Sequence, residues 1–288
     1  MVEYVDFAEY YDFDHAIAFD VEFYLDFARR CGSPILELGC GTGRLAVPLA
    51  EAGFEVYGID LSEHMLAVCR RKVHEQHLAD RVHLTLAHMA RFDLPRKGFA
   101  LAYVALRSFM HLLTQDDQLS CLRSVYQHLR PGGYFIVDVI APDFEALAQK
   151  PGGPFVVRRE FNLSNGHRVV RKDRLVEHDI VHQIRHFEFR FEEFDTAGTL
   201  VRERLIPLYT RYTFRYELQL LLERAGLAIV DVFKDYEKNA YDGTGEIIAV
   251  TRRVRASGDG DTDGAVVRAQ LPSAGKNHTD GKVVALVD

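Results

Sequence analysis

The residues best suited to chemistry lie in one short segment, which reads ILELGCGTGRLAVPLA over residues 35–50. An apolar run that carries one acid, Glu37, enters a turn with three glycines and leaves with the apolar spacing of a helix. Glycines let the backbone approach a ligand that a Cβ atom would exclude, and a helix start offers unpaired N–H groups. A second apolar run follows and ends in Asp60. The pattern predicts a strand, a ligand-binding turn and a helix. A second strand follows, and the acid at its end is expected to accept ribose hydroxyls.

The glycine spacing separates two classes of nucleoside cofactor. A dinucleotide fingerprint reads G-x-G-x-x-G, with its last glycine where the helix packs on the strand. Here the glycines are Gly39, Gly41 and Gly43, and Arg44 holds the position that the fingerprint reserves for glycine. The acid Glu37 beside the loop suits a cationic ligand better than a pyrophosphate. A nicotinamide-dependent oxidoreductase on a related sheet therefore remains only as an alternative.

With these features, the chain from about residue 10 to residue 253 resembles the class I (Rossmann-like) S-adenosylmethionine-dependent methyltransferases. The resemblance implies S-adenosyl-L-methionine as cofactor, which carries a sulfonium and an ammonium and no phosphate. It also implies an α/β fold with a seven-stranded, mostly parallel sheet. The residues that it assigns to cofactor binding lie in the N-terminal segment, the glycine loop and the turns after the next strands: Tyr11, Glu37, Gly39, Cys40, Gly41, Thr42, Gly43, Asp60, Leu61, Met65, His88, Met89, Leu106 and Arg107.

One position departs from the family pattern. The family often holds the adenine through an acid at the turn after the third strand, and His88 stands there instead. The hydrogen bond to the adenine amine is then left to a backbone carbonyl, while Met89 keeps the apolar contact.

Three residues are candidates on the acceptor side. His111 follows the fourth predicted strand, at the edge where open α/β sheets bind ligands, and could act as a base or orient the acceptor. The alternative is a buried histidine bonded to a backbone carbonyl. Tyr209 and Arg211 end a predicted strand and could bind the substrate, or could simply pack within a sheet. An in-line displacement at a sulfonium needs no covalent nucleophile, so positioning is the main task of such a site.

The composition and the hydrophobic pattern of the sequence change along the chain, and these changes predict four parts. They are an N-terminal helical cap (1–33), a Rossmann-like core (34–142 and 213–253), an inserted antiparallel β subdomain (151–212) and a disordered tail (254–288).

Several boundaries follow from local signals. Strands are expected over 155–160, 168–176, 180–194 and 200–212, with Asn165-Gly166 as a hairpin turn. The segment LRPGG is expected to end a helix before a strand over 134–140, and Thr213 to cap the last helix.

Composition limits the partners. The chain has 288 residues, 48% of them apolar, which suffices for a large core. A net charge of −7 argues against nucleic acid, whose phosphates need a basic surface. The four cysteines form no C-x-x-C pair, no signal peptide is apparent and no apolar stretch is long enough to span a bilayer. We expect a cytoplasmic monomer or homodimer with no metal, no membrane and no nucleic acid partner.

The sequence thus predicts a methyltransferase that acts on a nitrogen or oxygen atom of a small molecule. No N-P-P-Y-like tetrapeptide follows the fourth strand, which argues against adenine and glutamine amide acceptors. A methyltransferase-like module that binds the cofactor without turnover is the second alternative.

Overall fold

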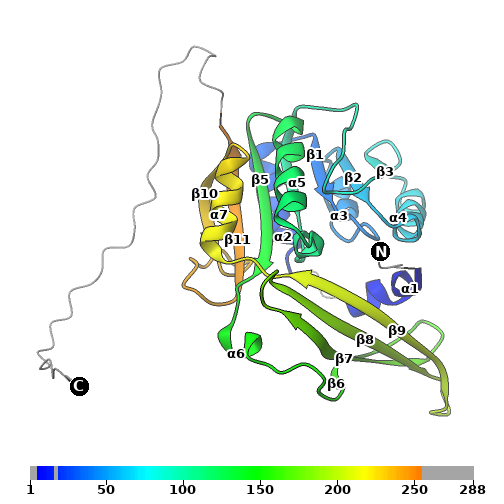
Figure 1. Cartoon of the computed structure of the whole chain (residues 1–288). Coiled ribbons are helices and arrows are strands. Elements are labelled where there is room, and N and C mark those ends of the chain that lie inside the picture. The colour runs from blue at the N-terminus through cyan, green and yellow to red at the C-terminus, as the bar shows by residue number, and fades with distance from the viewer. Residues whose placement is uncertain (1–4, 16–18, 255–288) are drawn as a thin grey trace, which may run out of the picture. The chain divides into compact units, whose positions relative to one another are not determined.

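A computed structural model describes residues 5–15 and 19–254, with side chains from Ala8 onward. The predicted tail lies outside these residues except for Val254. One seven-stranded sheet organises the main part of the chain, in the order β10-β11-β5-β4-β1-β2-β3 (Figure 1). Its strands are β1 (Ile35–Leu38), β2 (Val56–Asp60), β3 (Val82–Leu86), β4 (Phe99–Val104), β5 (Leu129–Ile140), β10 (Leu227–Phe233) and β11 (Glu246–Arg253).

The pairing of these strands confirms the predicted fold class. β1 pairs in parallel with β2 and with β4. β2 pairs in parallel with β3, and β4 pairs in parallel with β5. β11 is antiparallel to both of its neighbours, β5 and β10. Every residue of β1 and of β4 is buried, because helices cover both faces of a parallel sheet.

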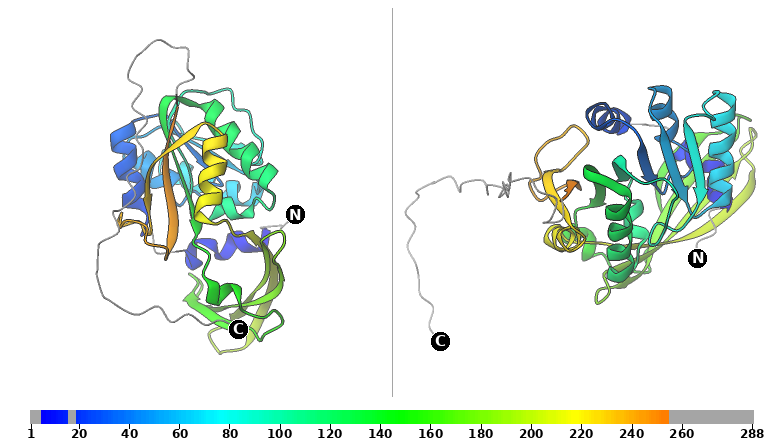
Figure 2. Two further views of the ribbon diagram at one scale, coloured as in Figure 1. Left: turned by 60° about the vertical axis from the view of Figure 1, so that its left-hand side comes forward. Right: turned by 90° about the horizontal axis from the view of Figure 1, so that it is seen from above.

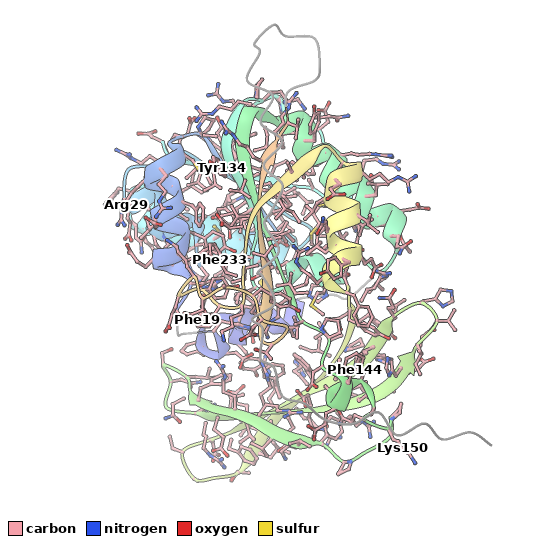
Figure 3. The ribbon with its side chains drawn as sticks, turned by 90° about the vertical axis from the view of Figure 1, so that its left-hand side faces the viewer. Phe19, Arg29, Tyr134, Phe144, Lys150 and Phe233 are labelled. Atoms are coloured by element: carbon pink, nitrogen blue, oxygen red, sulfur yellow. The ribbon has the colours of Figure 1, made fainter. Side chains whose placement is uncertain are left out.

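Helices pack on both faces of the sheet (Figure 2). α2 (Val21–Cys31), α3 (Ala46–Glu51) and α4 (Glu63–Glu75) contribute to one core cluster, in which Tyr134 of β5 and Phe233 of β10 are partly buried (Figure 3). α5 (Gln115–His128), α7 (Arg215–Arg224) and the 3-10 helix η1 (Ser108–His111) contribute to the other. Among the described residues, no helix is both long and apolar enough to cross a membrane.

A second sheet of four antiparallel strands is inserted between β5 and α7. Its order is β6-β7-β8-β9, and its strands are β6 (Val156–Asn162), β7 (Arg168–Asp179), β8 (Ile184–Phe194) and β9 (Leu200–Arg211). The short helix α6 (Phe144–Leu147) lies on the connection from β5. Helix α1 (Val5–Asp14) lies between the inserted sheet and α4 (Figure 1), and Tyr10 shares a core cluster with Met65 and Phe191.

Three local expectations were wrong in detail. β5 begins at Leu129 rather than Tyr134, because Leu129 already pairs with Phe99 of β4 and an irregularity in the register accommodates the glycines. Residues 180–183 form the turn between β7 and β8 rather than a strand. The N-cap of α7 is Phe214, without a side-chain hydrogen bond. The hydroxyl of Thr213 instead accepts hydrogen bonds from Gln118 and Arg211.

Candidate functional site

One cavity of about 600 Å³ lies at the carboxyl-terminal edge of the parallel strands. Its walls come from the glycine loop, from the turns after β2, β3 and β4, from α1 and from β7, β8 and β9 of the inserted sheet. Open α/β sheets bind ligands at this edge. The cavity therefore joins the predicted cofactor residues to the predicted acceptor region.

The structure brings most of the predicted residues into this cavity and leaves some outside it. The residues that line it are Tyr11, Gly39, Gly41, Asp60, Leu61, Met65, His88, Met89, Leu106, Arg107, His111 and Tyr209. The residues that do not are Glu37, Cys40, Thr42, Gly43 and Arg211.

The three glycines of the loop serve different purposes. Gly39 has a φ of +71°, and a Cβ atom there would lie 3.3 Å from the Cβ atom of Ser108, so the loop and the turn after β4 approach closely. A Cβ atom on Gly43 would lie 2.5 Å from the sulfur of Cys69 on α4. Gly43 is thus required for packing against α4, whereas Gly39 and Gly41 border the cavity.

The carboxylate of Asp60 is held by the loop that it faces. One oxygen accepts the backbone N–H of Gly41 and the other that of Ser62, both at 2.8 Å. Burial raises the pKa of this carboxyl group. A carboxylate has about four lone-pair sites, so each oxygen can still accept a ligand hydroxyl.

Glu37 lies behind the loop on β1 and is 4% exposed. Burial raises its pKa to about 8, although the charge of Arg44 opposes this shift. Its Oε2 atom accepts no hydrogen bond within the described part of the chain, although the neighbouring hydroxyl of Tyr103 also favours the ionised form. A buried carboxyl group with an unsatisfied oxygen fits a cationic group nearby, and the glycine loop leaves room for the backbone of such a ligand. The site therefore fits a ligand that carries a sulfonium and an ammonium.

Arg44 anchors the loop to α2. Its guanidinium donates two hydrogen bonds to Asp20, which is fully buried at the N-cap of α2. The residue that occupies the third glycine position of a dinucleotide fingerprint is thus a structural anchor here.

The turn after β3 fixes the ring of His88. Its Nδ1 atom accepts the backbone N–H of Ala90 at 3.0 Å, so the neutral ring carries its proton on Nε2. His88 can therefore donate a hydrogen bond into the cavity but cannot accept one through Nε2. Met89 also lines the cavity, beside Gly39.

The turn after β4 has an unusual backbone. Leu106 and Arg107 have φ values of +48° and +65°, a conformation that costs about 1–2 kcal/mol for a residue with a Cβ atom. Asp138 of β5 accepts both of their backbone N–H groups, at 3.0 and 2.7 Å. Tyr236, from the loop between β10 and β11, donates its hydroxyl to the same carboxylate. The side chain of Arg107 pairs with Glu246.

Asp138 was not anticipated. The signal was available, since Asp138 is the single acid in the apolar strand YFIVDVI, much as Glu37 is in β1. A lone acid in a buried strand needs hydrogen-bond donors, and these come from a turn about thirty residues earlier in the sequence.

Helix α1 contacts both sides of the cavity. Asp12 accepts the hydroxyl of Thr42 at 2.6 Å and pairs with Lys72 of α4 at 2.7 Å. Asp14, which is fully buried, pairs with Arg171 of β7. Tyr11 lines the cavity between these contacts. Thr42 therefore holds α1 rather than bordering the cavity.

The inserted sheet provides an aromatic wall opposite the loop. Phe187 and Phe189 of β8 line the cavity, together with Arg171 and Asp173 of β7. The guanidinium of Arg171 lies over the ring of Phe189, 4.9 Å from its centroid. Asp173 pairs with Arg158 at 2.7 Å. None of these four residues was assigned to the site from the sequence, because nothing local shows which face of an inserted sheet meets the core.

His111 and Tyr209, both predicted on the acceptor side, meet in the wall of the cavity. The Nδ1 atom of His111 lies 3.1 Å from the backbone carbonyl of Tyr209. A carbonyl only accepts, so Nδ1 carries the proton and Nε2 is the nitrogen that can accept one. Burial lowers the pKa of His111, which favours the neutral ring. Tyr209 itself stacks on His186, with 4.2 Å between ring centroids.

Arg211 lies outside the cavity and is 3% exposed. Its guanidinium pairs with Glu217 of α7 at 2.6 Å and donates hydrogen bonds to Gln118 and Gln183. These contacts join β9 to α5 and α7. The side chain therefore packs between these elements, outside the cavity.

Comparisons with known proteins agree with this geometry. Residues 35–133 match the model of a family described as "Methyltransferase domain". YqeM of Bacillus subtilis (strain 168), an inferred methyltransferase, is 27% identical over 202 residues, which is 70% of this chain and 76% of YqeM.

Solved structures extend the similarity well beyond residues 35–133. The CcbJ methyltransferase of Streptomyces caelestis is 27% identical, with a TM-score of 0.70 over 88% of this chain and 97% of CcbJ. An S-adenosylmethionine-dependent methyltransferase of Clostridium acetobutylicum shares the fold, at 21% identity and a TM-score of 0.71 over 88% of this chain and 99% of that protein.

Proposed function

We propose that this chain, which is a class I S-adenosylmethionine-dependent methyltransferase, transfers a methyl group to a nitrogen or oxygen atom of a small molecule by in-line displacement. The observation that carries the proposal is the single cavity shared by the Asp60 edge of the parallel sheet and the aromatic wall of the inserted sheet. A cofactor bound at one wall and an acceptor bound at the other would face each other within it.

We assign the cofactor half of the cavity to the residues of the parallel sheet. Asp60 would accept the ribose hydroxyls, and each such charge-assisted bond is worth about 1.5–3 kcal/mol. Gly39 and Gly41 would lie under the methionine portion, with the charge of Glu37 behind them. Met65, Met89 and the Nε2–H group of His88 would surround the adenine. When bound, S-adenosylmethionine supplies a methyl group already activated by a positively charged sulfur.

The remaining residues would position the acceptor. Holding two reactants in line can supply several orders of magnitude in rate without any covalent intermediate. Phe187 and Phe189 offer apolar contact, and Tyr209 orients His111 through its carbonyl. With Nδ1 bonded in this way, Nε2 of His111 could take a proton from a protonated amine or a hydroxyl. We do not assign a substrate contact to Arg211.

Two measurements test the proposal. Calorimetric titration with S-adenosylhomocysteine should show binding to the wild-type protein and much weaker binding to Asp60→Asn. Release of S-adenosylhomocysteine should then be followed with amines, amino sugars, phenols and alcohols as acceptors. Amino sugars belong in the panel because two proteins of the same fold are an amino pentose methyltransferase and a sugar N-methyltransferase.

The outcomes separate the alternatives. Binding with no turnover on any acceptor would favour a module that binds the cofactor without catalysis. Absence of binding at millimolar concentration would reject the cofactor assignment altogether. Turnover that is insensitive to Asp60→Asn would reject the proposed orientation of the ribose.

A further inference from the structure

The turn that joins β4 to η1 has a backbone that its own sequence does not favour. Two consecutive residues with side chains, Leu106 and Arg107, are left-handed, with φ values of +48° and +65°. Such a conformation persists only where surrounding contacts hold it, and it occurs most often at functional sites. Both residues line the cavity.

A buried carboxylate holds this turn from below. Asp138, which is 0% exposed, accepts the N–H of Leu106 at 3.0 Å and that of Arg107 at 2.7 Å. The hydroxyl of Tyr236 donates to it as well. With three donors within the chain and no exposure, this carboxylate acts on the turn and not on a ligand.

The same hydrogen bonds fix the direction of one carbonyl group. The peptide unit is planar and trans, so the carbonyl of Leu106 points opposite to the N–H of Arg107 and hence away from Asp138. The preceding carbonyl, of Ala105, is already bonded to the N–H and the hydroxyl of Ser108, at 3.2 and 2.8 Å. Among the described residues, no hydrogen bond ends on the carbonyl of Leu106.

We propose that Asp138 is a positioning residue for methyl transfer, which holds the left-handed turn so that the carbonyl of Leu106 accepts a hydrogen bond from the acceptor group. This inference rests on the proposed function and adds to that function a required property of the substrate. The acceptor atom must carry a hydrogen, as a primary or secondary amine or a hydroxyl does. That atom gains the methyl carbon as the carbon–sulfur bond breaks, and it then loses a proton.

The test separates positioning from stability. Asp138→Asn keeps the shape of the side chain but turns one acceptor oxygen into a donor, which conflicts with one of the two backbone N–H groups. We expect a decrease of at least tenfold in kcat on the amine or alcohol that gives turnover in the panel above. The affinity for S-adenosylhomocysteine should stay within about twofold, because Asp60 and the glycine loop, which are unchanged, carry most of the proposed cofactor contacts and Leu106 and Arg107 only border the site.

Two further variants serve as graded and matched controls. Tyr236→Phe removes one donor and leaves both backbone bonds, so kcat should fall only two- to threefold. Thr251→Val removes a buried side-chain hydrogen bond, to the carbonyl of Phe135 at 3.0 Å, on the same sheet. It should lower the melting temperature without changing kcat. If Asp138→Asn does not fold, the response of Tyr236→Phe decides the question.

The contrary results are distinct. An unchanged kcat in Asp138→Asn or Tyr236→Phe would overturn the inference while leaving the proposed function intact. So would an equal loss in both variants, or efficient methylation of a tertiary amine. Absence of turnover by the wild-type enzyme on every acceptor would overturn the proposed function and this inference with it.

Discussion

Binding of the cofactor should release a proton from Glu37. The perturbation is the arrival of a positively charged ligand beside a carboxyl group that burial keeps largely protonated. Its pKa is raised to about 8 in the protein alone. A nearby ammonium or sulfonium favours the ionised form and lowers the pKa again. The proton must then leave to the solvent.

The magnitude follows from the pKa of the free protein. At pH 7, a group with a pKa of about 8 is roughly 90% protonated, so binding should release about 0.9 proton if the complex holds the carboxylate. Because only the ionised form pairs with the ligand, affinity should increase about tenfold, or about 1.4 kcal/mol, for each pH unit up to about 8. Above that value the dependence on Glu37 should disappear.

Calorimetry measures this release directly. Titrations with S-adenosylmethionine at pH 7 in phosphate and in Tris should differ in apparent heat. The difference should equal the number of protons released multiplied by the difference between the ionisation enthalpies of the two buffers. Repeating them between pH 6 and 9 gives the dependence of the affinity on pH.

The variant Glu37→Gln is the control. It should bind more weakly at pH 8 and should lose most of the proton release. The free variant should also be more stable than the wild type near pH 8. A carboxyl group whose pKa is raised on folding favours the folded state at low pH and loses that contribution as pH rises from about 4.5 to about 8. Proton uptake on binding, or an equal release from the variant, would refute this reasoning.

Three substitutions test other parts of the site. Asp60→Asn should lower the affinity for S-adenosylhomocysteine at least tenfold by calorimetry, with the circular dichroism spectrum kept, and unchanged affinity would reject its ribose role. Gly43→Ala should lower the free energy of unfolding in urea by about 2 kcal/mol more than Gly41→Ala, because only the former clashes with Cys69; equal losses would contradict the packing role. Arg211→Leu should cost about 3 kcal/mol of stability while cofactor affinity is retained, and a stable variant without turnover would restore Arg211 as a substrate ligand.

The sequence was sufficient where the site is built from a contiguous motif. The strand, the glycine turn and the acid at the end of β2 follow one another, and the parallel pairing of β1 with β2 brings Gly41 to Asp60. Local chemistry dictates this arrangement, so Gly39, Gly41 and Asp60 could be expected at one edge of the sheet.

The sequence was insufficient to predict the site where the role of a residue depends on its position along a strand and not only on the face of the strand that it occupies. Tyr209 and Arg211 are two residues apart and share a face of β9, so alternation treats them alike. In the structure, Tyr209 borders the cavity, whereas Arg211 lies outside the cavity and pairs with Glu217 of α7. Only the placement of the inserted sheet on the core makes this distinction.

Thr213 illustrates a different limit. A threonine before a helical pattern is a good N-cap by propensity, but its hydroxyl is taken by Gln118 of α5, about a hundred residues earlier in the chain. A tertiary contact has displaced the local one, and α7 begins after Phe214 without a side-chain cap.

The contacts of α1 bear on the kinetics of ligand exchange. A single ten-residue helix is tied to the glycine loop and α4 through Asp12, and to the inserted sheet through Asp14. Undocking this helix would open both halves of the cavity together, with a free energy set by these ionic contacts and by the packing of Tyr10. Departure of the spent nucleoside and of the methylated product would then obey one local opening equilibrium, and the turnover number would report on that opening wherever chemistry is faster.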